Sequence, residues 1–443
     1  MDLLIAFSLS FILLIFSVFQ GYFIAYPLLI SIAIFLVVLN NRGFKLKRLI
    51  AMAVGGSKKS FSVLTILLLI GALIGVWMAA GTVPAIVFYG IKSIVPEYFI
   101  LAAFILSSLV SLLIGTSFGT VGTIGIALII MANSSAIDNN IVAAAIISGA
   151  YVGDRCSPMS SSANLVASLT KTKLYTNIKN MLVTGILPFL ASAVFYGILS
   201  PFNSGKIAEN NISLEIGKVF NINPIVLLPA IAILILCWFR VEVKISMLIS
   251  MVIGVAIALS IQDCSWQEIV KFMVLGFNID GDTELKSIFI GGGLLSMLKV
   301  SIMLIVSTAL AGILVGTRSI SVVEVFLKKA KSRSSIFLGT IVIATVSAAF
   351  GCTQTIAIIL TDELVKEKYE KEKLDNYLLA LDLENTAIVI SALIPWNMAG
   401  LVPATLLNTG AGFIPYACYL YLIPIWNSIQ LKRKEKTAQK PCN

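Results

Sequence analysis

The feature that most constrains this chain is a series of apolar segments, each long enough to cross a lipid bilayer as a helix. Because they are continuous blocks of Leu, Ile, Val and Phe, and not short stretches of alternating polarity, the sequence predicts helices and not a barrel. We expect an all-α polytopic membrane protein with about 12 passages. The clearest runs lie at residues 3–19, 22–39, 62–80, 98–114, 181–200, 224–239, 244–261, 287–316, 335–349 and 411–430.

The amino-acid composition limits the groups that could transfer protons or bind metals. Of the 443 residues 58% are hydrophobic and 12% are charged, so lipid is the main solvent. Histidine is absent, which leaves carboxylates or lysine for any proton transfer. The six cysteines lie far apart without a C-x-x-C pair, so we expect no zinc site, no disulfide framework and no cofactor. The amino terminus, Met1-Asp2, carries no positive charge before its apolar run, which argues against a cleaved signal peptide.

The net charge of +10 reflects membrane orientation and not a nucleic-acid partner, because the basic residues sit in loops between apolar runs. The loop at 42–59 carries six Lys and Arg residues without an acid, and the tail after 431 is similarly basic. We therefore expect both to be cytoplasmic, with both termini on the same side of a bacterial cytoplasmic membrane. The segment 318–333 is expected to form an interfacial amphipathic helix on that side.

Polar residues and helix breakers interrupt the apolar runs at 81–84, 115–123, 153–158, 350–355 and 395–397. Broken helices are tolerated in a bilayer only where the exposed backbone faces protein or a water-lined cavity, and that cavity is the expected substrate pathway. The polar residues at these breaks, together with one lysine in an apolar run, are the candidate pathway residues: Thr120, Thr123, Lys299, Thr353, Gln354, Thr355 and Asn397.

Two of these regions resemble each other. Residues 118–128 match residues 350–360 without a gap at six of eleven positions. Asp154 lies 36 residues after the start of the first segment, and Glu384 lies 34 after the start of the second. The pattern predicts an internal duplication, with two inverted repeats of discontinuous helices and re-entrant segments. We divide the chain into a hairpin and basic loop (1–60), a first repeat (61–200), a connecting region with two membrane helices (201–286), a second repeat (287–430) and a basic tail (431–443).

Few ionisable residues lie inside apolar runs, where a charge is costly and needs a partner or a function. Asp154 with Arg155 follows such a run, and this pair has a second interpretation as a structural ion pair. Glu384 interrupts another run beside Asp382, which we place close to an interface. Lys299 sits twelve residues into the run at 287–316. It is either a cavity residue or a side chain that extends to the interface.

At these positions the chain resembles the NhaC-type sodium/proton antiporters of bacteria, within a larger superfamily of inverted-repeat ion transporters. The resemblance spans most of the chain. Its most specific part is S-G-A-Y-V-G-D-R-C-S-P-M-S at 148–160, where arginine stands for the family's lysine. Further matches are L-E-N-T at 383–386, L-I-P-W-N at 393–397, G-A-L-I at 71–74, G-T-V-P at 81–84 and G-G-G-L-L-S-M at 291–297.

The resemblance implies an exchanger in the cytoplasmic membrane, with Asp154 and Glu384 framing the transport site across a pseudo-twofold axis. Around them the ion-binding residues would be Ser157, Ser160, Ser161, Asn164, Asn385 and Thr386, with no bound metal other than sodium near Asp154. This chain departs from the family pattern at Ser161 and Asn385, where the family has acids, and at Ala163, where it has a hydroxyl. Two fewer carboxylates lower the negative charge that would hold sodium.

Two transport modes fit these residues. In the first, Asp154 alternates between a proton and a monovalent cation, sodium by family default. In the second, Lys299 replaces one coupling ion and the polar residues bind a small organic solute such as an amino acid or a carboxylate. The expected partners are the lipid bilayer and the transported cation or solute, and a homodimer is compatible with the sequence.

Other classes fit less well. A channel would use a filter of repeated carbonyls or charged rings, whereas this chain has two pseudo-equivalent broken segments. An enzyme or an ATP-driven pump would need motifs that the sequence lacks, including H-E-x-x-H, G-x-S-x-G and the Walker loop. We therefore expect a secondary transporter and not an enzyme.

Overall fold

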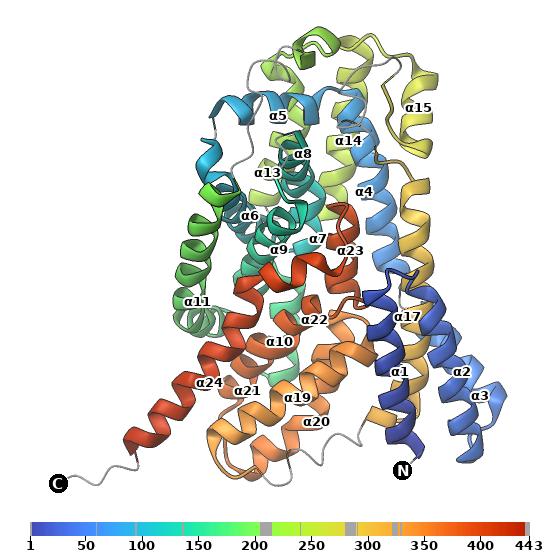
Figure 1. The fold of residues 1–443 in the computed structure, drawn as a ribbon, viewed down its shortest axis with the longest axis vertical. Helices are drawn as coiled ribbons and strands as arrows, with labels where there is room; N and C mark the ends of the chain where they lie inside the picture. The colour runs from blue at the N-terminus through green and yellow to red at the C-terminus, as the bar shows by residue number, and fades with distance from the viewer. Residues whose placement is uncertain are drawn as a thin grey trace.

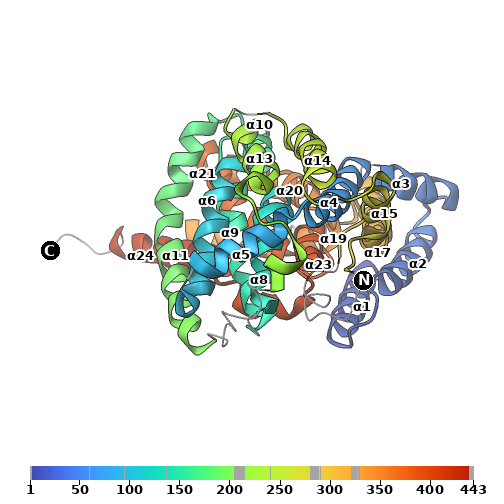
Figure 2. The same cartoon turned by 90° about the horizontal axis from the view of Figure 1, so that it is seen from above.

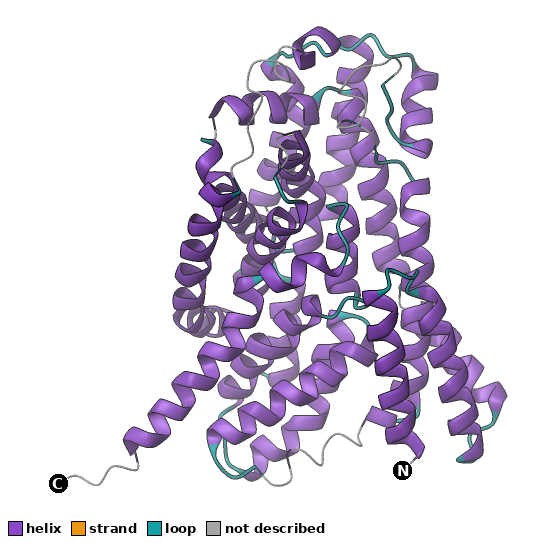
Figure 3. Ribbon diagram, viewed as in Figure 1, coloured by secondary structure: helices purple, strands orange, loops and turns teal. Residues whose placement is uncertain are grey.

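The computed structural model of the protein describes the backbone of residues 2–58, 60–93, 95–134, 137–203, 215–239, 241–279, 289, 291–320, 327 and 330–438. Helices make up almost all of this part of the chain (Figure 3). Its only β pairing is a single antiparallel bridge between Phe277 and Gly291. The predicted all-α fold class is confirmed.

The amino-terminal half contains eleven of the described α-helices, and a π-helical turn, Val121–Gly125, joins α7 to α8. They are α1 Asp2–Phe19, α2 Ala25–Asn41, α3 Leu46–Lys58, α4 Phe61–Ala79, α5 Thr82–Ser93, α6 Phe99–Ile114, α7 Ser117–Thr120, α8 Ile126–Ser134, α9 Asn139–Cys156, α10 Ser161–Thr170 and α11 Leu174–Phe202.

The carboxy-terminal half is built in the same way, and a π-helical turn, Glu384–Ile388, joins α21 to α22. Its described helices are α13 Leu228–Trp238, α14 Val243–Ser260, α15 Trp266–Leu275, α17 Leu298–Gly316, α19 Arg333–Gly351, α20 Gln354–Lys371, α21 Asn376–Leu383, α22 Val389–Leu393, α23 Met398–Leu406 and α24 Cys418–Ala438. Short 3₁₀ turns precede several of these helices: Pro96–Tyr98 before α6, Pro224–Leu227 before α13, Leu295–Met297 before α17 and Ala411–Tyr416 before α24.

Within the described ranges, six helices are long and apolar enough to cross a membrane, or up to eight if each of two bent helix pairs counts as one span. The bent pairs are α3 with α4 and α21–α22 with α23. Three further apolar helices are shorter. The chain is therefore a multi-pass membrane protein, and the expectation of about 12 passages stays a prediction.

Helix α9 is the centre of the fold, and its residues from Ile141 to Cys156 are all buried. It packs against α6, α8, α10, α11 and α24, while α1–α3 and α17 lie to one side of the molecule (Figures 1 and 2). Contact between α9 and α6 is close because Gly153 has no side chain: a Cβ there would stand 2.0 Å from the carbonyl oxygen of Ser111. The acid that follows, Asp154, is thereby placed deep in the protein.

All five predicted breaks interrupt helices in the structure. Gly81 separates α4 from α5, and Gly115 ends α6 with a left-handed φ of 75° that glycine adopts without strain. Residues 157–160 separate α9 from α10 and residues 394–397 separate α22 from α23, each with an extended backbone at its first and last position. Cys352 ends α19 in the left-handed region, which is unusual for a non-glycine residue.

Apart from α5, whose counterpart at 319–330 lies mostly outside the described residues, the helix boundaries of residues 61–174 recur 237 residues later, in residues 298–411. Helices α4 and α17 both have 19 residues at this offset. So do the spans Pro96–Ile114 and Arg333–Gly351. Further pairs at the same offset are the left-handed residues Gly81 and Arg318, Gly115 and Cys352, and Lys171 and Asn408, the capping residues Asp138 and Asp375, and the break residues Pro158 and Pro395.

This offset corrects the pairing expected from sequence. Phe118 lies after the break that follows α6, whereas Phe350 lies before the break that follows α19, so the gapless match of 118–128 with 350–360 is out of register by five residues. At the structural offset Asp154 corresponds to Ser391, and Glu384 corresponds to Ile147. The two acids are therefore not at equivalent positions.

Helices α4 and α17 lie side by side and run in opposite directions (Figure 1). Just before the start of α17, the backbone N–H of Gly293 donates to the carbonyl of Gly71 in α4 at 2.6 Å. Near the other end, Gly56 in α3 packs against Thr308 and Gly312 of α17. Residue numbers thus rise along the bent pair α3–α4 as they fall along the neighbouring segment 293–312.

Candidate functional site

A cavity of about 370 Å³ lies where the helix breaks meet. The first residues of α7, α10, α20 and α23 all line it, with parts of α4, α9 and α17. Polar residues of the lining come mainly from the breaks and from the first residues of the helices that follow them, and apolar ones from α4 and from later positions of α20. The lining residues are Ser60, Val63, Ile66, Thr116, Ser117, Phe118, Asp154, Ser161, Ser162, Thr308, Thr353, Gln354, Thr355, Ile356, Ile359, Met398 and Ala399.

Asp154 is the only acid in this lining, and it is 3% exposed. One carboxylate oxygen accepts a hydrogen bond from the side-chain Nε2 of Gln354 at 2.7 Å. The other accepts a longer one, at 3.4 Å, from the backbone N–H of Ser117. Ser117 and Gln354 are the first residues of α7 and α20 and stand at equivalent positions. Asp154 thus connects both broken helices, each of which presents its positive end to the carboxylate.

The polar side chains that follow Asp154 mainly hold the shape of the break. Ser157 donates to the carbonyl of Leu112 at 2.8 Å, and Asn164 donates to the carbonyls of Pro158 and Ser160 at 3.1 and 2.7 Å. The Ser160 hydroxyl donates to the carbonyl of Asp154 and accepts from the N–H of Ala163, which caps α10. Of the predicted ion-binding serines, Ser161 lines the cavity.

Arg155 points away from the cavity and is completely buried. Its guanidinium donates to the Tyr419 hydroxyl, the Met181 carbonyl and the Thr184 hydroxyl at 3.1–3.3 Å, and also to the amide oxygen of Asn385. Since no carboxylate lies within 4 Å of it among the described residues, Arg155 is not in a direct ion pair with Asp154. The sequence suggested an Asp154–Arg155 pair as one interpretation, and the structure does not show it.

Glu384 is also completely buried, and neither carboxylate oxygen has a hydrogen-bond partner in the described part of the chain. Arg155 supplies the opposite charge nearby and Asp154 a like charge. Asn385 links this region to Arg155, while the Thr386 hydroxyl donates to the carbonyl of Asp382 in its own helix at 2.6 Å. Glu384 and Asn385 therefore form a second polar cluster with Arg155, next to the cavity but not in its lining.

Asp382 forms the one strong ion pair of this region. Its carboxylate accepts from Arg333 at 2.7 and 2.8 Å, and from the Tyr369 hydroxyl. Arg333 is the first residue of α19 and the last residue of the basic segment 318–333. The pair ties the start of α19 to the end of α21.

The predicted pathway residues fall into three groups. Thr353, Gln354 and Thr355 line the cavity. Thr120, Thr123 and Asn397 are bonded within the fold: the two threonine hydroxyls donate to carbonyls of their own helix at 2.9 and 2.7 Å, and Asn397 caps α23 and donates to the carbonyl of Ala348. Lys299 lies exposed in the first turn of α17 and does not line the cavity.

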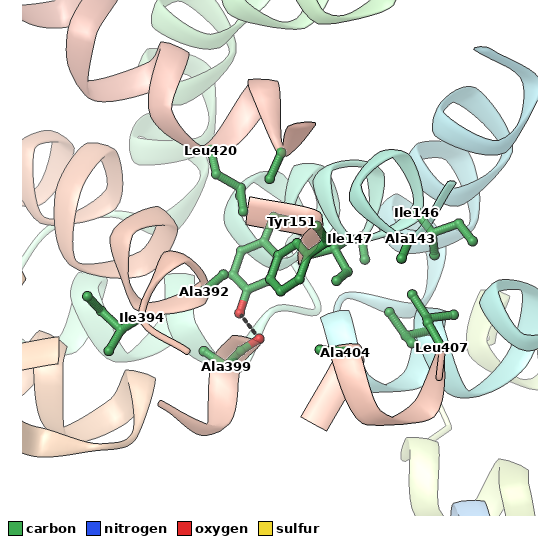
Figure 4. Packing of buried hydrophobic residues seen from close by; sticks show 14 of the residues in the cluster. Ala143, Ile146, Ile147, Tyr151, Ala392, Ile394, Ala399, Ala404, Leu407 and Leu420 are labelled. Atoms are coloured by element: carbon green, nitrogen blue, oxygen red, sulfur yellow. Dashed lines mark hydrogen bonds between the residues drawn. The ribbon is translucent and has the colours of Figure 1, made fainter. Parts of the chain in front are cut away.

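Sequence reasoning missed several lining residues, including Ser60, Ser117, Ser162 and Thr308. Their signal was present only in part: Ser117 lies in the break at 115–123, but Ser60 and Thr308 come from helices that meet it only in the folded chain. Tyr151 was also missed. It donates to the carbonyl of Ala399 at 3.0 Å and packs among apolar side chains of α9 and α22–α24 (Figure 4), which closes this side of the site.

A buried carboxylate at the meeting point of broken helices in a multi-pass membrane protein is the arrangement of secondary transporters. Comparison with known families agrees. The model of the Na+/H+ antiporter family matches residues 2–163 and 149–429. The chain belongs to this family.

Characterised relatives are similar over most of their length. A malate-2H(+)/Na(+)-lactate antiporter of Bacillus subtilis is 30% identical, and the match covers 91% of this chain and 88% of the relative. The Na(+)/H(+) antiporter NhaC of the same organism is also 30% identical, over 90% of both chains. An arginine/ornithine antiporter, ArcD of Halobacterium salinarum, is 27% identical over 81% of this chain and 76% of its own length.

Proposed function

We propose that this protein is a secondary antiporter that exchanges protons for a monovalent cation, sodium by family default, through alternating access. The observation that carries the proposal is Asp154: one nearly unexposed carboxylate on the wall of a cavity formed by helix breaks. A proton and a cation cannot both neutralise the same carboxylate, so each displaces the other. Competition at a single group makes the exchange obligatory.

The groups around Asp154 suit this role. Hydroxyl oxygens of Thr116, Ser161 and Thr355 line the same cavity and are hard ligands of the kind that alkali cations prefer. Gln354 holds the carboxylate in place without supplying a charge that would compete with the cation. We assign the ion-binding role to these residues and keep Glu384 and Asn385, with Arg155, as a supporting cluster.

Alternating access would follow from an inverted repeat. Residues 61–174 and 298–411 share their helix boundaries, and α4 and α17 run antiparallel, which supports two copies of one unit inserted in opposite directions. We propose that one copy moves against the other about the cavity. We further propose a cytoplasmic-membrane location with the 42–59 loop and the carboxy-terminal tail inside the cell, because their basic residues carry few compensating acids.

The test is proton flux in proteoliposomes that contain an internal pH dye. An imposed gradient of sodium, lithium or potassium should move protons in the opposite direction, and Asp154→Asn should reduce the flux to that of protein-free vesicles. The matched control is Ser391→Ala at the equivalent position, where the hydroxyl donates only to its own helix. If Asp154→Asn still exchanges protons for a cation, the site is elsewhere.

A second candidate function is exchange of a small organic solute, as the names of the malate/lactate and arginine/ornithine relatives state for those proteins. The reason that the sequence offered, a cavity-facing Lys299, does not hold, because Lys299 is exposed outside the cavity. The size of the cavity is a better reason. Its volume of about 370 Å³ falls in the range of small-molecule sites and greatly exceeds one cation.

A further inference from the structure

Helices α10 and α20 both begin at the cavity. Their first two residues, Ser161 and Ser162 in α10 and Gln354 and Thr355 in α20, are all part of its lining. The two helices pack against each other, so their amino termini lie on one side of the space. Because α10 has 10 residues and α20 has 18, each contributes a positive helix end to that side.

The backbone N–H groups at these two starts are free to bind a ligand. In each helix the capping side chain serves the third N–H, Ser160 for Ala163 and Thr353 for Ile356. No hydrogen bond among the described residues reaches the N–H groups of residues 161, 162, 354 and 355. Helix α23 differs, since its first two N–H groups donate to Cys352 and Asn397.

Ser162 is an independent sign of a ligand. Its side chain lines the cavity, the residue is 8% exposed, and its hydroxyl has no partner in the described part of the chain. No lysine or arginine lines the cavity, so the donors available to an anion are these N–H and O–H groups. The lining also contains Val63 and Ile66 of α4 and Ile359 of α20, which offer apolar contact for a short carbon skeleton.

We propose that the cavity binds a small organic carboxylate, with its anionic group on the N–H donors of α10 and α20 and on the Ser162 hydroxyl. The inference rests on the proposed antiport function and names the class of solute that accompanies the proton. An inorganic anion shares the charge but would leave the apolar wall and most of the volume empty.

The position of this subsite couples it to Asp154. Gln354 begins α20 and its side chain also donates to the Asp154 carboxylate, so this residue belongs to both sites. Two negative charges this close repel in a space with little water, and the organic anion therefore binds best when Asp154 is protonated. The charge of Asp154 also acts on Glu384 and Tyr151, while Arg155 is directed away toward Asn385. The carboxylate and the proton then move together, and the cation moves in the opposite direction.

The first experiment measures binding to the purified protein in detergent, with L-malate and L-lactate as choline salts and their neutral amides as controls. The carboxylates should bind, and bind more tightly at pH 5.5 than at pH 8, whereas the amides should bind at least about tenfold more weakly. Equal binding of acid and amide would overturn the proposal, and so would binding of the acids that tightens as the pH rises. Chloride that competes as well as malate would show a general anion site and overturn the organic assignment.

A pair of variants isolates the backbone donor. Ser161→Ala removes the hydroxyl and keeps the N–H, whereas Ser161→Pro also removes the N–H. Proline suits this position because it is the first of the helix and Ser160 before it is extended. We expect about tenfold weaker malate binding in Ser161→Pro than in Ser161→Ala, a comparison in which both variants lack the hydroxyl assigned to the cation. Equal malate binding in the two would contradict the subsite, and if the proline variant does not fold, the acid–amide comparison decides.

The same preparation separates this inference from the function on which it rests. Sodium/proton exchange that is insensitive to every carboxylate would overturn the inference and leave the antiporter. Carboxylate binding without any exchange would overturn the antiporter function and keep the site.

Discussion

The two helix breaks at residues 157–160 and 394–397 share a backbone and differ in chemistry. Both begin with an extended residue, carry a proline next and end with a side chain that caps the following helix. The first break follows Asp154 and is rich in hydroxyls. The second follows Ser391 and contains Trp396, whose indole N–H donates to the carbonyl of Ala349.

The two halves therefore share the backbone arrangement of the break, but they do not share the acidic residue beside it. Ser391 is fully buried and donates to its own helix, so the second half has no acid at the position of Asp154. Glu384 has no acidic counterpart in the first half, where Ile147 stands. The first half supplies the cavity carboxylate, Asp154. The second half supplies Gln354, and its Glu384 and Asn385 form the buried cluster with Arg155 of the first half.

The sharpest way to break this comparison is to move the acid. In the Asp154→Asn background, Ser391→Asp restores the carboxylate at the equivalent position. We expect no recovery of exchange, because residue 391 does not line the cavity and faces no free helix start. Proton flux in proteoliposomes measures it, with Asp154→Asn/Ser391→Asn as the neutral control of the same size. Recovered flux would mean that the two halves are functionally interchangeable.

The second effect in size concerns Arg155. Replacing it with methionine removes the opposite charge near Glu384 and leaves the acceptors of Asn385 and Met181 without their donor, which should cost about 1–3 kcal/mol of stability for each acceptor. Arg155→Lys keeps the charge and should lose less. Thermal unfolding in detergent measures the order.

A double variant tests why stability is lost. If the buried charge is responsible, Glu384→Gln should restore part of the stability lost in Arg155→Met, although it adds a second substitution. Additive losses would show that Arg155 acts through its neutral hydrogen bonds alone.

A substitution in the second break, at residues 394–397, should affect stability and not ion binding. Asn397→Ala removes the cap of α23 and leaves the carbonyl of Ala348 without its donor, which should lower stability by about 2 kcal/mol. Sodium affinity of the folded fraction should not change, because Asn397 does not line the cavity. A change in affinity without a change in stability would place Asn397 on the substrate path, as the sequence suggested.

Lys299 offers a smaller effect. Since it is exposed in the first turn of α17, Lys299→Ala should keep the ion dependence of the native protein and change its stability by no more than about 0.5 kcal/mol. Flux measured against sodium, lithium and potassium is the check. A new requirement for sodium would show that Lys299 does substitute for a coupling ion.

Much of this structure could be predicted from local patterns. Apolar runs and breakers identified the fold class and all five breaks, because lipid restricts an unpaired backbone to a few places. Asp154, singled out as an acid after an apolar run, lies in the lining of the cavity. The register between the two halves was not predicted correctly, because chance identities around Phe118 and Phe350 suggested a different alignment. At the structural offset most side chains differ between the halves, while the capping residues Asp138 and Asp375 are the same.

The sequence also could not predict which polar side chains line the cavity and which form hydrogen bonds within the fold, because this depends on tertiary packing. Nothing local distinguishes Ser162, which lines the cavity, from Ser157, which bonds to a carbonyl of α6. Lys299 was misplaced because the apolar run at 287–316 was taken as one helix, whereas α17 begins only at Leu298, after Gly291, Gly292 and Gly293 with positive φ. The lysine therefore lies at a helix start and not in the middle of a span.

The smallest expected effect on stability concerns the start of α19. There Glu435 from the carboxy-terminal tail accepts hydrogen bonds from the Ser334 hydroxyl at 2.5 Å and from the Ser334 N–H at 2.7 Å. These bonds hold the pKa of Glu435 below its ordinary value near 4.5. The contact therefore stabilises the fold above that pH and is lost as the pH falls through the lowered pKa. Because Glu435 is only partly buried, Glu435→Gln should lower the Tm at pH 7 by only about 1 °C, and the two proteins should converge in more acidic buffer. Thermal unfolding at pH 7 and pH 3.5 measures the difference, and a gap that widens in acid would show that the carboxylate does not hold the tail to α19.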